Sequence, residues 1–172
     1  MILLTAPILL LGLTANAVQA SQCKEINELD QYQKSDLRAA YNHGSTVDLG
    51  LTLAAIALKE SNAGKYRLNY HSKDFGMFMI NIETIKSYFK TENMYENIMY
   101  AQQVIHDDYL GAKLAISVLD EFKERGYRKM LMSYNEGNLW KVNQQSRKKA
   151  EKYANDVIKY TVKLRVCNGW QI

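Results

Sequence analysis

Apolar residues recur three and four positions apart along most of the chain, and this pattern predicts a mainly helical protein. The spacing predicts helices over residues 23–42, 49–58, 81–89, 95–125, 130–135 and 146–165. We expect Gly44 to end the first helix, with Ser45 or Thr46 capping the next. Gly111 is a candidate break inside the long fourth segment, and Gly126 closes that segment.

The segment 49–58 differs from the other helices because it is apolar almost all round. A helix without a polar face must be surrounded by protein, so we expect it to be central and buried. Residues 64–80 have no helical period and are rich in turn-forming residues, which predicts one long irregular loop or a small hairpin. The 172 residues suffice for one domain with a real core, so the fold class is a single, mainly α domain.

The first twenty residues carry no Lys, Arg, Asp or Glu and contain an apolar run over 2–13. The small residues Val18 and Ala20 suit cleavage by signal peptidase before Ser21. The predicted organisation is a signal peptide over 1–20 and an exported domain over 21–172, placed in the periplasm or cell envelope. An uncleaved anchor and a buried helix are the alternatives. The run is short of the about 20 apolar residues that span a bilayer, so we expect no stable membrane span in the mature chain.

Two cysteines, Cys23 and Cys167, lie near the two ends of the exported domain. An oxidising compartment permits a disulfide between them that would tie the termini together. Two unrelated free thiols are the alternative that the sequence leaves open.

Charge and metal-ligand patterns narrow the classes of function. The formal net charge of +4 is a mild bias toward anionic surfaces, without the dense basic stripe of a nucleic-acid binder. Its sign suits the polyanionic bacterial cell wall. The three histidines are scattered without metal-ligand spacing, and no phosphate-binding glycine loop is present. We therefore expect no metal, no cofactor and no nucleic-acid partner.

Glu60 is a carboxylate at the end of the apolar helix. Burial disfavours the charged form of a carboxyl group, so the pKa of a carboxyl held there should be raised. A raised pKa lets a carboxylic acid donate a proton near neutrality, as the cleavage of a glycosidic bond requires. The alternative is a helix-terminal side chain that points into solvent beside Lys59.

Further motifs follow Glu60 in a fixed order along the chain. They are Glu60-Ser61 at the helix end, Asp74-Phe75-Gly76-Met77-Phe78-Met79-Ile80-Asn81 in the irregular region, Tyr134-Asn135-Glu136-Gly137, and Tyr153 on the last helix. In this order they resemble the SLT-type lytic transglycosylases of the lysozyme-like superfamily, over about Leu49 to Leu164. The resemblance implies a lysozyme-like α+β fold and an enzyme that acts on the glycan strands of peptidoglycan.

The resemblance also implies roles for residues at matching positions. Glu60 would protonate the glycosidic oxygen and then act as a base, and Ser61 would steady the helix end or the substrate. Gly76 would let the backbone approach the sugar, and Tyr134 would lie near Glu60. The residues assigned to substrate binding are Ser61, Gly76, Met77, Phe78, Met79, Tyr134, Asn135 and Tyr153. Core packing is the alternative for the two tyrosines.

One position departs from the family pattern, because Met79 stands where the family carries Gln. Methionine cannot donate a hydrogen bond to a sugar. A catalytically weak peptidoglycan-binding protein is therefore one alternative function, and a hydrolytic muramidase is the other.

The family chemistry needs one protein carboxyl. The acetamido group and the C6 hydroxyl of the substrate carry out the displacement and leave a 1,6-anhydro-MurNAc end. Asp74, Glu83 and Glu136 are candidates for a second acid, and we favour a mechanism with Glu60 alone. Small exported enzymes of this kind resemble those that open the wall for secretion, conjugation or pilus machines or for phage, so a component of such a machine is a candidate partner.

Overall fold

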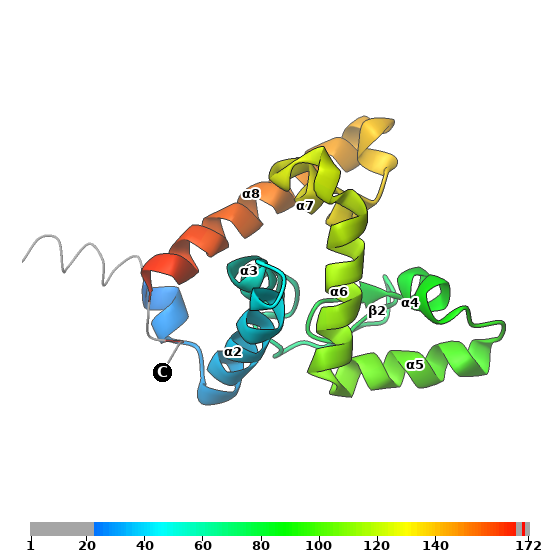
Figure 1. The fold of residues 1–172 in the computed structure, drawn as a ribbon, viewed down its shortest axis with the longest axis horizontal. Helices are drawn as coiled ribbons and strands as arrows, with labels where there is room; N and C mark the ends of the chain where they lie inside the picture. Colours follow the sequence, from blue (N-terminus) through cyan, green and yellow to red (C-terminus); the bar gives the residue numbers. More distant parts are fainter. Residues whose placement is uncertain (1–22, 168–169, 171–172) are drawn as a thin grey trace, which may run out of the picture.

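The computed structural model describes residues 23–167 and Trp170 and is mainly helical, with one small sheet, as the sequence predicts (Figure 1). Its elements are α2 (Gln31–Ser45), α3 (Gly50–Ser61), β1 (Leu68–Asn69), β2 (Asp74–Phe75), β3 (Ile80–Asn81), α4 (Ile82–Phe89), α5 (Met94–His106), α6 (Asp108–Phe122), the 3-10 helix η1 (Lys123–Arg125), α7 (Tyr127–Glu136), the 3-10 helix η2 (Leu139–Lys141) and α8 (Gln144–Val166). A helical turn over 23–27 precedes them.

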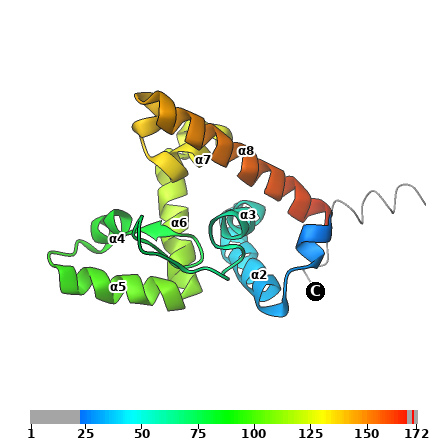
Figure 2. The ribbon, with the colours of Figure 1, turned by 180° about the vertical axis from the view of Figure 1, so that it is seen from behind.

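The central helix is α3, as its all-round apolar sequence predicts. Nine of its twelve residues are buried, so it has no face left for solvent. It lies between α2 and α8 in both views of the ribbon (Figures 1 and 2). Leu53, Ile56 and Leu58 are almost completely buried, and each contributes about 1.5–3 kcal/mol through removal from water. This packing fixes the end of α3, where Glu60 stands.

The irregular region forms a three-stranded antiparallel sheet in the order β1-β2-β3. Leu68 pairs with Phe75, and Phe75 pairs in turn with Ile80. Each strand has only two residues, which is too short for an alternating pattern to be read from the sequence. The sheet packs with α4 and α5, which lie on the opposite side of α6 from α2 (Figure 1).

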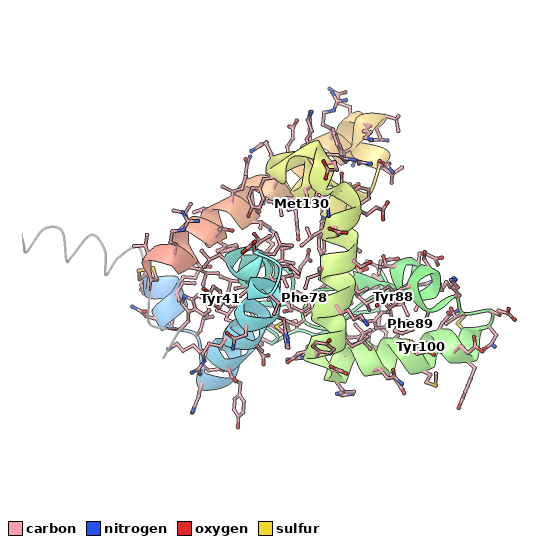
Figure 3. The ribbon with its side chains drawn as sticks, viewed as in Figure 1. Tyr41, Phe78, Tyr88, Phe89, Tyr100 and Met130 are labelled. Atoms are coloured by element: carbon pink, nitrogen blue, oxygen red, sulfur yellow. A yellow bond between two sulfur atoms is a disulfide. The ribbon has the colours of Figure 1, made fainter. Side chains whose placement is uncertain are left out.

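Aromatic side chains of α4 and α5 pack together against the edge of the hydrophobic core. Phe89 stacks on Tyr100 with ring centroids 3.9 Å apart, and Tyr88 meets Phe89 edge-on (Figure 3). Phe78 is fully buried and lies between α3 and α6, where it joins this part to the central helix (Figure 3).

Some predicted helix boundaries are wrong because side-chain caps decide them. The predicted helix over 23–42 is broken before α2, where Asp30 and Gln33 form a reciprocal capping box. The predicted helix over 95–125 is two helices, and the break is at Asp107, whose carboxylate caps α6 by accepting from the Leu110 amide. Gly111 is buried within α6, where a Cβ would lie 3.3 Å from the Phe78 ring.

The first helix ends at Ser45, close to the expected stop at Gly44, but Gly44 has another role. Gly44 lies inside α2, and a Cβ there would meet the Leu49 carbonyl oxygen at 2.6 Å. The glycine therefore permits close approach of two chain segments and does not end the helix. Neither Ser45 nor Thr46 caps the next helix, because α3 begins at Gly50 after Leu49.

Cys23 and Cys167 form a disulfide, with their Cα atoms 5.5 Å apart, so of the two alternatives that the sequence left open the structure shows the pairing. The bond joins the helical turn over 23–27 to the end of α8. Beside it, Trp170 is completely buried and donates from Nε1 to the Leu164 carbonyl. The predicted signal peptide over 1–20 lies outside the described residues.

Arg67, just before β1, connects the loop that follows α3 to α2 and to the start of α6. It pairs with Asp36 of α2 at 2.6 Å and with Asp108 at the start of α6. It also donates to the carbonyls of Gly64 and Ile105 at 3.1 and 3.2 Å. Each of its nitrogens thus has an acceptor, so this half-buried cation fixes the loop that follows Glu60.

Candidate active site

The C-terminal end of α3 presents Glu60 in a fixed position. Ser61 is fully buried; its hydroxyl donates to the Ala57 carbonyl at 3.0 Å and accepts from the Gly64 amide at 2.8 Å. Asn62 adopts a left-handed conformation that stops the helix. The Gln33 side chain of α2 donates to the Asn62 carbonyl at 2.8 Å. These bonds occupy the polar groups of the helix end and leave the Glu60 carboxyl free to face the adjoining pocket.

Glu60 lines a pocket of about 310 Å³ between α3, the sheet, α4, α6 and α7. The other residues that line the pocket are Ser72, Asp74, Met79, Ile80, Asn81, Thr84, Val118, Tyr134 and Asn135. Burial raises the pKa of Glu60 from 4.5 to about 7; the neighbouring Tyr153 hydroxyl opposes this rise, and the nearby charge of Asp74 adds to it. The carboxyl is therefore a proton donor near neutral pH.

Two tyrosines stand behind Glu60. The rings of Tyr134 and Tyr153 stack with centroids 6.3 Å apart, and the Tyr134 hydroxyl donates to the Phe78 carbonyl at 2.9 Å. The Tyr153 hydroxyl is buried and makes no hydrogen bond of good geometry within the described part of the chain. It lies close enough to Glu60 to lower the pKa of that carboxyl. Burial raises the pKa of both phenols well above 10, so both remain neutral donors.

The sheet supplies a second carboxylate to the same pocket. Asp74 of β2 accepts from the Asn81 side chain at 2.7 Å, and Asn81 also donates to the Ser72 carbonyl at 2.9 Å. Asn81 in turn caps α4 by accepting from the Glu83 amide. Asp74 is thus held against Asn81 of β3, and its charge acts on Glu60 across the pocket.

A second cavity extends the first. It has about 690 Å³ and shares Asn81, Thr84, Val118, Tyr134 and Asn135 with the Glu60 pocket. Its remaining lining comes from α4, the end of α6 and the end of α7. The two cavities together form one elongated groove with Glu60 at one end, which suits a polymeric substrate better than a small molecule.

The structure brings together four of the predicted site residues and separates the others. Glu60, Met79, Tyr134 and Asn135 line the same pocket. Met77 and Phe78 are core residues with 1% and 0% exposure, so their side chains do not line the pocket to which they were assigned. Both side chains are apolar and belong to the hydrophobic core.

Three further assignments change with the structure. Gly76, with φ of +76°, packs against α5, where a Cβ would lie 2.4 Å from the Val104 carbonyl oxygen, so the close approach is to protein and not to sugar. Ser61 is fully engaged in ending α3 and does not reach the pocket. Tyr153 is a buried partner of Glu60 and does not form a wall of the groove.

Ser72, Asn81 and Thr84 line the pocket but were not assigned to it from the sequence, although Asn81 ends the motif that begins at Asp74. Ser72 lies in the turn before β2, Asn81 ends the two-residue strand β3, and Thr84 lies in the first turn of α4, so no shared periodicity marks them as one face. Asp74 was recognisable only as a candidate second acid. Its position beside Glu60 depends on the register that pairs Asp74 with Asn81.

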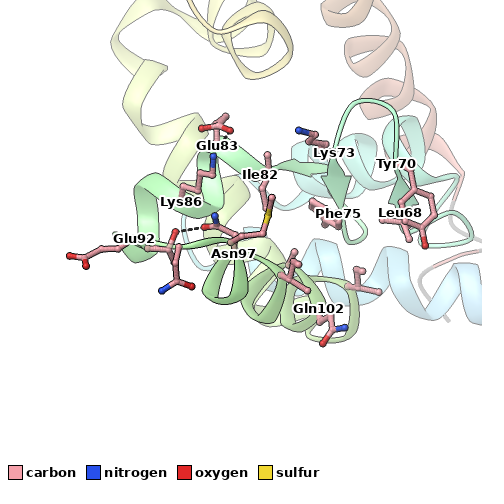
Figure 4. A pocket seen from close by; sticks show the side chains of 16 residues that line it. Leu68, Tyr70, Lys73, Phe75, Ile82, Glu83, Lys86, Glu92, Asn97 and Gln102 are labelled. Atoms are coloured by element: carbon pink, nitrogen blue, oxygen red, sulfur yellow. Dashed lines mark hydrogen bonds and ion pairs between the residues drawn. The ribbon is translucent and has the colours of Figure 1, made fainter.

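The reverse side of the sheet carries a separate cavity of about 680 Å³ (Figure 4). Its apolar floor comes from Leu68, Phe75, Ile82 and Ile98, and the charged Lys73 and Lys86 stand on its rim (Figure 4). Asp74 and Asn81 face the Glu60 pocket, whereas their neighbours Phe75 and Ile82 face this cavity. The sheet therefore separates the two spaces, and the chemistry belongs to the side with the carboxylates.

Over the described ranges, 23–167 and Trp170, no three His, Cys, Asp or Glu side chains gather as a metal site would require. In the same part of the chain, no helix has both the length and the apolarity needed to cross a bilayer.

A buried central helix that ends in a proton-donating carboxyl beside a small antiparallel sheet defines a lysozyme-like domain. The chain belongs to the Transglycosylase SLT domain family, whose profile matches residues 45–157. The matched segment contains Glu60, the sheet, Tyr134 and Tyr153. No curated protein and no solved structure matches the chain significantly. Family membership implies, at the level of the family, an enzyme that acts on peptidoglycan.

Proposed function

We propose that this protein is a peptidoglycan lytic transglycosylase that cleaves the β-1,4 bond between MurNAc and GlcNAc and leaves a 1,6-anhydro-MurNAc end. The observation that carries the proposal is the Glu60 carboxyl, which stands at the end of a groove with its pKa raised to about 7. A neutral carboxylic acid at that position can protonate a leaving glycosidic oxygen.

The proposed reaction needs one protein carboxyl. Glu60 donates its proton to the bridging oxygen as the bond from that oxygen to C1 of MurNAc breaks, and the acetamido oxygen of MurNAc stabilises C1. The C6 hydroxyl of the same sugar then attacks C1 and returns its proton to Glu60. The phenol of Tyr153 supports the ionised form of Glu60 between these two steps, because it remains a neutral donor.

The test is a digest of purified peptidoglycan by residues 21–172, with the products analysed by mass spectrometry. Anhydro-muropeptides would support the proposal. Reducing-end products would instead assign a muramidase, for which the second carboxylate, Asp74 in the same pocket, is the favouring observation. Glycan binding without either product would assign a wall-binding protein.

The pH profile of cleavage should reveal the pKa of Glu60 and the role of Asp74. Only the protonated acid starts the reaction, so kcat/KM should fall about tenfold per pH unit above about 7. In Asp74→Asn the negative charge that raises the pKa of Glu60 is removed, so the fall should begin at lower pH. Its maximal rate should stay within about tenfold of wild type, because this carboxylate takes no part in proton transfer.

The asparagine keeps an oxygen that can accept from Asn81, so the sheet should remain intact. Rates measured on soluble glycan strands from pH 5 to pH 9 would make the comparison. A loss in Asp74→Asn as complete as in Glu60→Gln would instead show that both carboxylates are needed.

Met79→Gln should improve substrate binding, because it adds an amide that can bond to the sugar where the native side chain offers only a thioether. Met79 lines the pocket and has φ of +48°, a conformation equally accessible to Gln. We expect KM to fall about threefold to tenfold with little change in kcat. The matched control is Met79→Leu, which keeps the size but adds no donor and should leave KM near the wild-type value.

We also propose that residues 1–20 are a signal peptide and that the enzyme works in the cell envelope. The Cys23–Cys167 disulfide supports this placement, because such bonds persist in oxidising compartments. A component of an envelope-spanning secretion, conjugation or pilus machine, or of phage, is the kind of partner that we propose. An exported protein whose first residue is Ser21 would support the predicted cleavage.

A further inference from the structure

The positive charge of the chain is concentrated at one end of the molecule. Residues 123–152 contain nine Lys and Arg and three Asp and Glu, a formal charge of +6. The whole chain carries +4, so all other residues together carry −2. This segment runs from η1 through α7 and η2 to the start of α8, which meet at the end of α8 remote from the disulfide (Figure 1).

Several of these cations are exposed and have no acidic partner among the described residues. Lys129, Lys148 and Lys149 are exposed, and none of them forms an ion pair there. Arg128 bonds only to the neutral Asn155 side chain. Lys141 lies over the Trp140 ring, 6.0 Å from its centroid. These charges are therefore available to an anionic partner outside the chain.

Two aliphatic side chains project beside these cations. Leu139 is 60% exposed and Val142 is 85% exposed, and both belong to the turn around η2 between α7 and α8. Trp140, between them in sequence, is half-buried and donates from its ring nitrogen to the Ser133 hydroxyl at 3.0 Å. We call this turn with its flanking cations the η2 tip, comprising Leu139, Trp140, Lys141, Val142, Arg147, Lys148 and Lys149.

The η2 tip is held in place by the helices on either side. Arg147 of α8 donates to the carbonyls of Trp140 and Lys141, each at 3.2 Å. None of the residues 138–152 lines any of the three cavities described above. The tip is thus pre-organised and lies outside the groove that Glu60 lines.

We propose that the η2 tip is a docking surface for an anionic lipid bilayer. An anionic bilayer presents phosphate headgroups above apolar acyl chains. The lysines of the tip can contact the phosphates, while Leu139 and Val142 can insert at the boundary with the acyl chains. A soluble polyanion would satisfy only the cations and leave the aliphatic side chains in water. Trp140 has the amphipathic ring that favours the membrane interface.

The η2 tip directly follows Ser133, Tyr134, Asn135 and Gly137, which line the groove. Docking would therefore hold the groove next to the membrane and direct the proposed cleavage to membrane-proximal glycan. The docking itself requires no glycan, so its test is independent of the proposed function.

The experiment is co-sedimentation of residues 21–172, with the disulfide intact, with vesicles of phosphatidylglycerol mixed with phosphatidylcholine. We expect binding to these vesicles and at least about tenfold weaker binding to phosphatidylcholine alone. The double variants Lys148→Glu with Lys149→Glu and Leu139→Ser with Val142→Ser should each weaken binding about tenfold. The charge-matched control, Lys65→Glu with Lys113→Glu, changes the net charge equally but at exposed positions outside the tip, and should bind like wild type.

Tryptophan emission gives a second readout at the tip itself. Trp170 is completely buried, so a blue shift on adding vesicles reports Trp140, and Trp140→Phe should abolish the shift. Equal weakening in the tip variants and in the charge-matched control would overturn the proposal, because binding would then depend on net charge alone. Binding to purified peptidoglycan that the tip variants lose, without binding to vesicles, would assign the tip to the wall polymer and also overturn it.

Discussion

Glu60→Gln is expected to lower the rate of glycan cleavage by about 10²–10⁴-fold, because it removes the only proton donor that the proposed mechanism uses. The amide has nearly the same shape as the acid but no proton to transfer at this pH. The measurement is the release of products from purified peptidoglycan by the variant and by wild type. Glu151→Gln makes the same chemical change at an exposed position on α8 and should leave the rate unchanged.

The same substitution should stabilise the fold at neutral pH. Burial raises the pKa of Glu60 from 4.5 to about 7, so the native state binds a proton more tightly than the unfolded chain does. Raising the pH from about 4.5 to about 7 therefore lowers the free energy of unfolding of wild type by up to about 3 kcal/mol, and the loss is constant at higher pH.

Glutamine does not ionise, so the free energy of unfolding of the variant does not fall with rising pH through this side chain. The Tm of Glu60→Gln should exceed that of wild type by about 5 °C or more at pH 8, and the difference should shrink toward pH 4.5. A lower Tm for the variant at pH 8 would contradict a partly buried carboxyl with a raised pKa. An unchanged rate with an intact fold would exclude Glu60 as the acid.

Replacing both cysteines, Cys23→Ser with Cys167→Ser, is expected to lower the free energy of unfolding by about 4–5 kcal/mol. The disulfide closes a loop with a sequence separation of 144, and the chain entropy of the unfolded state rises when so long a loop is opened. Denaturant unfolding of the variant and of the oxidised wild type, followed by circular dichroism, gives the difference. The reduced wild type is the control and should match the variant.

The disulfide lies at the end of α8 remote from Tyr153 and the groove. At a low temperature, at which the variant is folded, the variant should therefore retain its catalytic rate. The effect of the disulfide on stability can thus be separated from any effect on the catalytic rate. A variant that is as stable as wild type would show that the packing of Trp170 and Leu164 suffices to hold the ends together.

The sequence determined which parts are helical and which helix is central. The all-round apolar stretch of α3 has no solvent face to offer, and the apolar spacing of α8 leaves only one face to pack. The order of motifs also singled out Glu60 as the candidate acid, which the structure places in the pocket at the end of α3. These conclusions depend on the spacing of apolar residues and on the order of motifs along the chain, and both can be read from a single sequence.

The tertiary structure decided the composition of the groove. Met77 and Phe78 belong to the same motif as Met79, yet of these three only Met79 lines the pocket, while the other two are buried in the core. Asp74 stands beside Glu60 through the pairing of two-residue strands, and the break between α5 and α6 depends on the Asp107 cap. Contacts between segments far apart in the chain fix each of these features, and no periodicity along the sequence records such contacts.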